Sequence, residues 1–179
     1  MVQSANASPL NQAPTPTPLP ADIAQIVQLE TDRSLCAEPT STTSCFHDLP
    51  GSSAFEQAIA AGKINIEVLT DYEISNTVTL DGRNLYAPNG TLATLSIAAT
   101  ACPDPMIEIS GSSIIRNLLI DGNCDAAPSN VRLIVVNSPG TVSITGNTLT
   151  NGTIAIEHQD NTGSLSIDLN QITGNTSYG

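Results

Sequence analysis

The feature that most constrains this chain is an internal repeat in its C-terminal half, with a period of about 23 residues. Apolar and asparagine positions recur together, because Val131, Leu133, Val142, Ile144, Asn147 and Leu149 are followed one period later by Ile154, Ile156, Leu165, Ile167, Asn170 and Ile172. Five of the first six residues also have counterparts about 24 residues earlier in the chain. These counterparts are Ile107, Ile109, Leu118, Ile120 and Asn123. A fixed period of this length is typical of a solenoid, in which each repeat stacks only on its neighbours.

Within each repeat the apolar residues form short alternating pairs, such as Ile107-Glu108-Ile109, Val142-Ser143-Ile144 and Ile154-Ala155-Ile156. Alternation with a period of two predicts strands with the outer two residues facing inward. Turn-forming residues such as Gly146-Asn147 separate these pairs. Residues 104–179 contain no apolar run at helical spacing, which excludes a helical solenoid. The sequence therefore predicts an all-β chain, with two or three short strands in each coil of a parallel β-helix.

From about Ser53 onward the chain resembles the right-handed parallel β-helix family, the pectate-lyase-like solenoids. Residues 53–62 are similar to the short amphipathic helix that caps the first coil of such proteins, with Phe55, Ala58 and Ile59 on one face and Gly62 at its end. Residues 72–82 are similar to the first coil itself. The resemblance implies a right-handed β-helix over residues 53–179, and these motifs specify a fold without specifying a substrate.

The first fifty residues do not have the composition of a core. Residues 1–20 are rich in proline and predict an extended polyproline II arm. Residues 21–52 form a separate N-terminal segment with a loop that we expect a disulfide to hold. Apolar residues at its start are spaced to pack on the first coil or on a partner, and these are Ile23, Ile26, Val27 and Leu29.

Four cysteines indicate the compartment. Cys36 and Cys45 flank one loop, Cys102 and Cys124 bracket one coil, and neither spacing resembles a zinc site. Two local disulfides are the most economical of the three connectivities, and they would indicate an extracellular or cell-surface location. Free buried thiols are the alternative.

Charge and composition bear on the partners. Seventeen acidic residues against five basic ones give a net charge of −12, which argues against nucleic acid and against an anionic membrane surface. No run of eighteen apolar residues exists that could span a membrane. Carbohydrate is a further candidate partner, but sugar platforms need flat aromatic faces, and the chain has no tryptophan, three tyrosines and two phenylalanines.

One asparagine position recurs in successive repeats. Asn123, Asn147 and Asn170 align, so their side-chain amides are predicted to hydrogen-bond along the stack as an asparagine ladder. The alternative is that asparagine is simply common in turns.

No motif indicates catalysis, and no cofactor is expected. His47 and His158 have no nucleophile at a known motif spacing. The densest acidic group is a candidate calcium site, formed by Asp104, Glu108, Asp121 and Asp125. Turn formation explains Asp121 equally, because it lies in an Asp-Gly turn. Glu108 and Arg132 align in adjacent repeats and are expected to form a surface pair.

The repeat reaches residue 177 without any recognisable cap. We expect the last coil to expose apolar residues that another coil could cover, namely Ile154, Ile156, Leu165, Ile167 and Ile172. Either a longer solenoid continues there, or another chain completes the end. The favoured interpretation is a non-enzymatic, exported structural subunit that stacks head to tail into a filament, with the N-terminal arm as a candidate completing strand. The alternative is the N-terminal part of a polysaccharide lyase or hydrolase, or of a larger β-helical adhesin.

Overall fold

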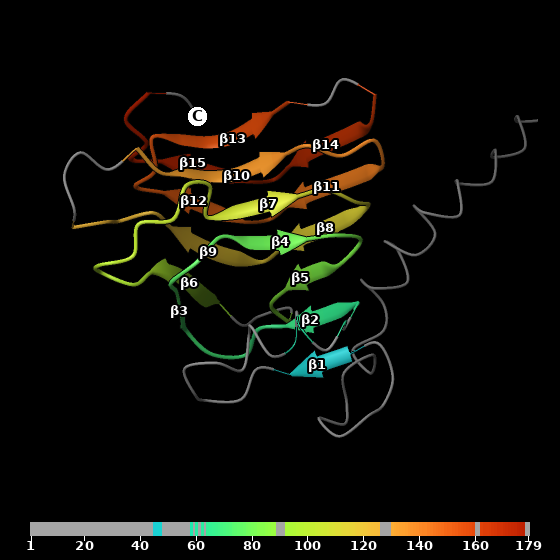
Figure 1. The fold of residues 1–179 in the computed structure, drawn as a ribbon, viewed down its shortest axis with the longest axis horizontal. Coiled ribbons are helices and arrows are strands. Elements are labelled where there is room, and N and C mark those ends of the chain that lie inside the picture. The colour runs from blue at the N-terminus through green and yellow to red at the C-terminus, as the bar shows by residue number, and fades with distance from the viewer. Residues whose placement is uncertain are drawn as a thin grey trace, which may run out of the picture.

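A computed structural model of the chain describes residues 64–88, 92–125, 130–159 and 162–177, together with the backbone of 45–47 and the single residues Ala58, Ala60 and Gly62. Within these residues, three parallel sheets run along the length of the molecule (Figure 1). The strands are short, from three to five residues. This arrangement confirms the prediction of a parallel β-solenoid.

The three sheets are named here A, B and C. Sheet A contains β1 (Cys45–His47), β2 (Asn65–Glu67), β5 (Asn84–Tyr86), β8 (Ser113–Arg116), β11 (Thr141–Thr145) and β14 (Ser164–Asp168). Sheet B contains β3 (Tyr72–Ile74), β6 (Ala93–Ile97), β9 (Leu118–Asp121), β12 (Thr148–Thr150) and β15 (Gln171–Thr173). Sheet C contains β4 (Val78–Leu80), β7 (Ile107–Ile109), β10 (Arg132–Val136) and β13 (Ile154–His158).

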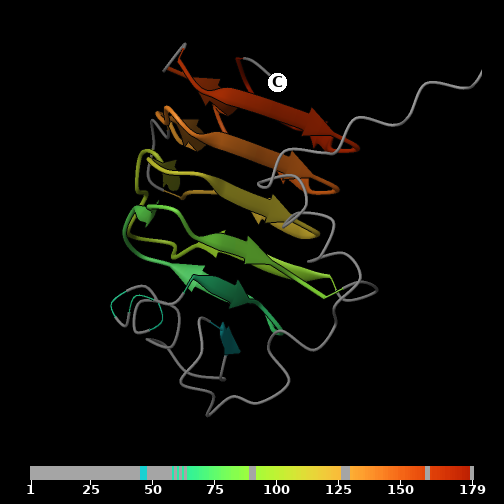
Figure 2. The same cartoon turned by 90° about the vertical axis from the view of Figure 1, so that its right-hand side faces the viewer.

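The chain visits the sheets in the order A, B, C and then begins again one level higher. The successive coils are β2-β3-β4, β5-β6-β7, β8-β9-β10 and β11-β12-β13, and β14 and β15 begin a further one. Figure 2 shows these levels stacked from green to red. The described solenoid therefore has about four turns, and each coil contacts mainly the coils directly before and after it.

The core lies inside the coils, where aliphatic side chains from the three sheets meet. Sheet A contributes a column of fully buried residues, one above another on paired strands, and these are Ile66, Leu85, Ile115 and Ile144. Sheet B contributes a similar column of Leu95, Ile120 and Leu149. Burying one such side chain contributes about 1.5–3 kcal/mol, so stacked columns of this kind hold the coils together.

The predicted register is correct between the last two levels of sheets A and B. Val142 pairs with Leu165, Ile144 with Ile167 and Leu149 with Ile172, and each pair is one period apart. The register predicted for the preceding repeat is wrong. Ile144 pairs with Ile115 rather than Ile120, and Ile120 pairs with Leu149. The reason is that β8 and β9 are separate strands in different sheets, whereas the sequence interpretation placed Leu118 and Ile120 where β8 lies.

In sheet C the predicted register is wrong, by one residue between β10 and β13 and by three residues between β7 and β10. Arg132 pairs with Ile154 and Ile134 with Ile156. The consecutive residues Leu133 and Ile134 both belong to the core, which breaks the alternation. As a result Ala155 is fully buried, and Ile154 is half-buried and outside the core cluster, although the alternating pattern pointed Ile154 inward.

The N-terminal predictions fall mostly outside the described residues. In the expected capping helix at 53–62, Ala58 and Ala60 have helical backbone, Ala58 is fully buried, and Gly62 follows with a φ of 67°. The arm at 1–20 lies outside the described residues, as does the segment 21–52 apart from β1. No helix among the described residues is long and apolar enough to cross a membrane.

Candidate functional site

Exposed apolar side chains gather at the two ends of the solenoid. Among the described residues, the large apolar side chains that are exposed are Ile64 (49%), Leu69 (39%), Leu92 (68%), Ile167 (49%), Leu169 (82%) and Ile172 (37%). Ile64 and Leu69 flank β2 on the first coil, and the last three lie on β14, β15 and the turn between them. Leu92 is the exception, because it precedes β6 on the side of the molecule.

The three strands β13, β14 and β15 form what we call the terminal edge. In the described chain each is the last strand of its sheet and pairs with one neighbour only. The edge contains the five apolar residues expected there: Ile167 and Ile172 are exposed, Ile156 and Leu165 are half-buried against the core, and Ile154 is half-buried. Ile144, which pairs with Ile167, is fully buried. One further level on this edge would therefore bury Ile167 as the level of β14 buries Ile144.

Leu169 is the residue of this edge that the sequence interpretation missed. It lies between β14 and β15 in a left-handed conformation, with a φ of 55°. The corresponding turns of the two preceding levels have Asn117 (φ 58°) and Gly146 (φ 66°), residue types that tolerate this conformation. A signal was present in the sequence, because the repeat aligns Gly146 with Leu169.

The structure brings Asn147 and Asn170 together and leaves Asn123 apart. Asn147 is almost fully buried, and its amide nitrogen donates to Asn170 Oδ1 at 3.0 Å. Asn123 is exposed in a turn after β9, where its backbone N–H donates to Asp121 Oδ1. The ladder position of that coil is occupied by Leu118, whose N–H donates to Asn147 Oδ1 at 3.0 Å.

A second corner is stabilised in the same manner by a residue that the sequence interpretation did not select. Asn175 Oδ1 accepts a hydrogen bond from Gly152 N–H at 2.9 Å, and its amide nitrogen donates to the carbonyl of Leu149. Asn170 does the same at the first corner, accepting from Asn147 N–H and donating to the carbonyl of Ile144. In each case the side chain of one coil satisfies backbone groups of the coil before it.

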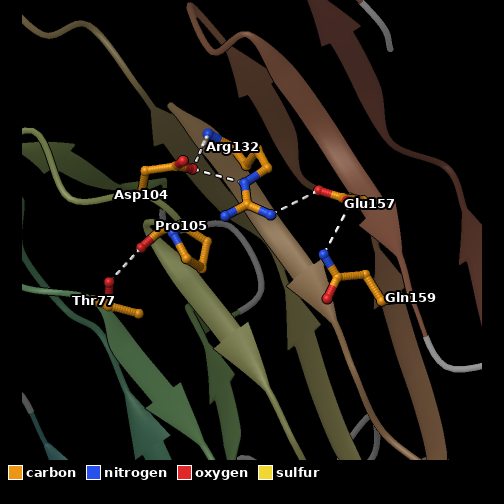
Figure 3. A network of polar contacts seen from close by, with 6 residues as sticks. All are labelled: Thr77, Asp104, Pro105, Arg132, Glu157 and Gln159. Atoms are coloured by element: carbon orange, nitrogen blue, oxygen red, sulfur yellow. Dashed lines mark hydrogen bonds and ion pairs between the residues drawn. The ribbon is translucent and has the colours of Figure 1, made fainter. Parts of the chain in front are cut away.

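A polar network crosses the outside of sheet C (Figure 3). Arg132 donates from Nε to Asp104 Oδ1 at 2.8 Å and from Nη1 to Glu157 Oε2 at 3.0 Å, and Gln159 donates to the other oxygen of Glu157. The hydrogen bonds from Gln159 and Arg132 lower the pKa of Glu157, and those to Asp104 and Glu157 raise the pKa of Arg132. This network links three coils in a partly exposed setting.

The expected pairing of Glu108 with Arg132 is wrong. Ile107 pairs with Ile134, further along the chain than one period, so Glu108 lies opposite Val135. This longer spacing places Arg132 beside Asp104 instead, where its backbone N–H also donates to the Asp104 carboxylate.

The four candidate calcium ligands do not form a metal-binding group. Asp104 contacts Arg132, whereas Asp121 accepts hydrogen bonds from Asn123 N–H and from the side-chain amide of Asn151. Across the part of the chain that the structure describes, no three histidine, cysteine, aspartate or glutamate side chains lie close enough to hold a metal ion. His158 is exposed at the end of β13, and only the backbone of His47 is described.

The outer side of sheet A has an enclosed charged column. Glu67, Tyr86 and Arg116 follow one another on paired levels, and each is less than a tenth exposed. The Arg116 guanidinium lies 5.6 Å from the centre of the Tyr86 ring. Burial, with a smaller contribution from the negative charge of Glu67, raises the pKa of the Tyr86 hydroxyl well above its ordinary value. The sequence interpretation did not select these residues, because their alignment depends on the register of β2, β5 and β8.

Cys102 and Cys124 form a disulfide with their Cα atoms 5.6 Å apart. The bridge joins the loop before β7 to the loop after β9, and so it ties two successive coils together. Cys36 and the side chain of Cys45 lie outside the described residues, as do Ile23, Ile26, Val27 and Leu29 of the predicted arm.

Comparisons with protein-family models, with curated proteins and with solved structures found no match to this chain. The sheet topology nevertheless defines its class, which is the parallel β-solenoid.

Proposed function

We propose that this chain is an exported, non-enzymatic structural subunit that stacks head to tail with further copies of itself, forming a filament outside the cell or at its surface. The observation that carries the proposal is the placement of exposed apolar residues. Five of the six large ones among the described residues lie on the first or the last coil. Clustering of this kind marks interaction sites, whereas single exposed apolar residues do not.

A further coil that stacked on the terminal edge would meet the same features that each inner coil offers to the coil after it. β13, β14 and β15 continue sheets whose every pairing is parallel. Ile167 and Ile172 continue the columns that contain Ile144 and Leu149. Exposed strand edges favour pairing with another chain.

The two ends of the solenoid are different surfaces, which determines the kind of assembly. The first coil contributes Ile64 and Leu69, and the last contributes Ile167, Leu169 and Ile172. Contact between unlike surfaces of identical chains propagates as an open filament when the rotation between copies does not close a ring. The Pro-rich arm at 1–20, with Ile23, Ile26, Val27 and Leu29, is in this proposal a candidate strand for completing an end.

Two further features support export and a structural role. A disulfide between Cys102 and Cys124 is favoured in oxidising compartments. Asp104 and Asp121 are engaged in contacts that hold coils and turns, rather than in a pair arranged for acid and base chemistry.

Electron microscopy and sedimentation velocity of the purified chain test the proposal. We expect fibres from the unaltered chain, loss of fibres for Ile167→Glu, and fibres as usual for Leu92→Glu, which adds the same charge at an exposed residue away from both ends. Circular dichroism would verify that both variants stay folded. Deletion of residues 1–30 tests the arm separately, and loss of fibres would support its role in completing an end of the solenoid.

Two results would contradict the proposal. One is an unaltered chain that stays monomeric at every salt and protein concentration. The other is an Ile167→Glu variant that forms fibres as well as Leu92→Glu does. Cleavage of a polysaccharide by a longer natural chain that contains these coils would favour the alternative, an enzyme of which this solenoid is one part.

A further inference from the structure

We infer that the outer face of sheet A is a docking surface within the molecule, and that residues 21–44 of the same chain cover it. The outer face is defined here by five side chains on β2, β5, β8 and β11, namely Glu67, Tyr86, Ile114, Arg116 and Ser143. These strands lie one above another along the solenoid (Figure 1). The inference is independent of the filament, because it concerns the side of the solenoid and not its ends.

The five side chains point away from the core. Each is the neighbour in sequence of a residue in the buried column of sheet A, and successive residues of a strand point to opposite sides of the sheet. The register agrees, because Ile114 lies opposite Ser143 and Arg116 lies opposite Tyr86. Ile114 and Tyr86 are accordingly buried residues that do not belong to the core cluster.

This face is nevertheless shielded from water, because each of the five residues is less than a tenth exposed. The outward positions of sheet B include no buried residue in the described chain. Sheet C has one, Val135, which lies between Glu108 and Glu157 of the paired strands. Two of the five on sheet A carry a charge, which is seldom buried without protein around it. A further segment of protein therefore covers sheet A.

One segment of the chain is long enough and free enough to do so. Sheets B and C lie on the other side of the core. Residues 89–91, 126–129 and 160–161 join corners of the solenoid and are too short to cross a face about 14 Å high and return. Residues 48–57 are tied at both ends, between β1 and Ala58 of the core cluster. Residues 1–44 are held at one end only.

The point of attachment also favours this segment. Residue 44 directly precedes β1, and β1 pairs with β2 as the outermost strand of sheet A. The chain therefore joins the solenoid at the edge of the face in question. From β1 to β11 the distance is about 20 Å, which roughly six extended residues span. Residues 21–44 are several times that length.

Composition separates residues 21–44 from the proline-rich residues before them. Ile23, Ile26 and Val27 are spaced to form one apolar side, which fits the apolar surface of Ile114 and the Tyr86 ring. In this placement they bind the side of the solenoid instead of completing its end. Residues 1–20 then stay available to reach an end.

The first experiment measures trypsin cleavage after Arg33, a site inside the docked segment. Ile114→Asp puts a charge on the covered face without touching the core, so we expect cleavage after Arg33 to be about tenfold faster or more than in the unaltered chain. Thr148→Asp is the matched control, because Thr148 is an outward, half-buried residue of sheet B, and it should leave the rate unchanged. Circular dichroism verifies that both variants keep the strand content.

The second experiment changes the segment and observes the face. We expect the double variant Ile23→Asp with Ile26→Asp to raise nitration of Tyr86 by tetranitromethane about tenfold, because release of the segment exposes the ring. Val2→Asp with Leu10→Asp adds the same charges to residues 1–20 and should leave Tyr86 protected. Tyr72, a buried core residue, is the internal reference and should stay unreactive in both variants. Peptide mass spectrometry locates the nitrated residue.

Three results would overturn the inference. One is cleavage after Arg33 in the unaltered chain as fast as in a synthetic peptide of residues 21–44. Another is a Tyr86 that stays protected in the Ile23 and Ile26 variant. The third is protection of Arg33 that appears only as the protein concentration rises, which would place the segment on sheet A of another copy. Protection of Arg33 in a chain that never forms fibres would support this inference while the filament fails.

Discussion

At the scale of single residues, the buried side chain of Asn147 is tolerated because it replaces strand hydrogen bonds at a corner of the solenoid. Asn147 is 1% exposed, and it donates to the carbonyl of Ile115 and to Asn170 Oδ1 while it accepts from Leu118 N–H. An unsatisfied polar group in such a place costs about 1–3 kcal/mol. The carboxamide therefore contributes by satisfying groups that the tight turn leaves without strand partners.

Replacing Asn147 with leucine, the residue that occupies this position one coil earlier, should lower the free energy of unfolding by about 2 kcal/mol, because the backbone groups of Ile115 and Leu118 lose their partner. Urea denaturation measures the loss. Asn123→Leu is the matched control, since Asn123 is exposed, and it should change stability by less than about 0.5 kcal/mol. Equal losses for the two variants would show that the corner hydrogen bonds contribute nothing specific.

At the scale of strands and coils, the length of a coil varies much more than the length of its strands. Asn65 pairs with Asn84 on the next level, whereas Leu85 pairs with Ile115, so the second coil is much longer than the first. Most of this variation is in the corners, because every strand has three to five residues. The stack is held by short strand segments, and the connections between them can lengthen without disturbing it.

This variation explains what could be predicted from the sequence. Period-two alternation and turn residues are local features of the sequence, so the solenoid class could be predicted from them. The register between two coils could be predicted only where the spacing of paired residues equals the sequence period, as between Ile144 and Ile167. It failed in sheet C because Leu133 and Ile134 both enter the core, and alternation cannot show that. The terminal edge followed from the repeat, but the conformation of Leu169 requires coordinates.

The disulfide is the one covalent cross-link between coils in the described chain, and its removal should lower the stability of the fold. Bridging Cys102 to Cys124 closes a loop with a sequence separation of 22. We expect Cys102→Ala to lower the free energy of unfolding by about 3 kcal/mol in urea denaturation. The double variant with Cys124→Ala should lose nearly the same amount, because the first substitution already opens the bridge. Additive losses would mean that each cysteine contributes by packing instead.

At the scale of the whole molecule, an acidic chain must overcome its own repulsion in order to assemble. The net charge is −12, and each added copy brings the same charge to the filament. The proposed contact is apolar, so it gains nothing from opposite charges across the joint. The strength of association is therefore the sum of a favourable burial and an unfavourable repulsion that salt can screen.

Association should accordingly strengthen with ionic strength. Raising NaCl from about 0.02 M to about 0.5 M shortens the screening length from roughly 20 Å to roughly 4 Å, and we expect the dissociation constant for addition of a copy to fall. Sedimentation equilibrium at each salt concentration measures this. Weaker association at high salt would indicate a joint built on opposite charges, and would contradict the apolar contact.

The direction of the corner hydrogen bonds also has a consequence for how the protein is made. Asn147, Asn170 and Asn175 each satisfy backbone groups of the coil that precedes their own. A ribosome releases the chain from its N-terminus, so the backbone groups at these corners have no side-chain partner until the following coil has emerged. The most recently made coil is therefore the one whose corner groups are still unsatisfied.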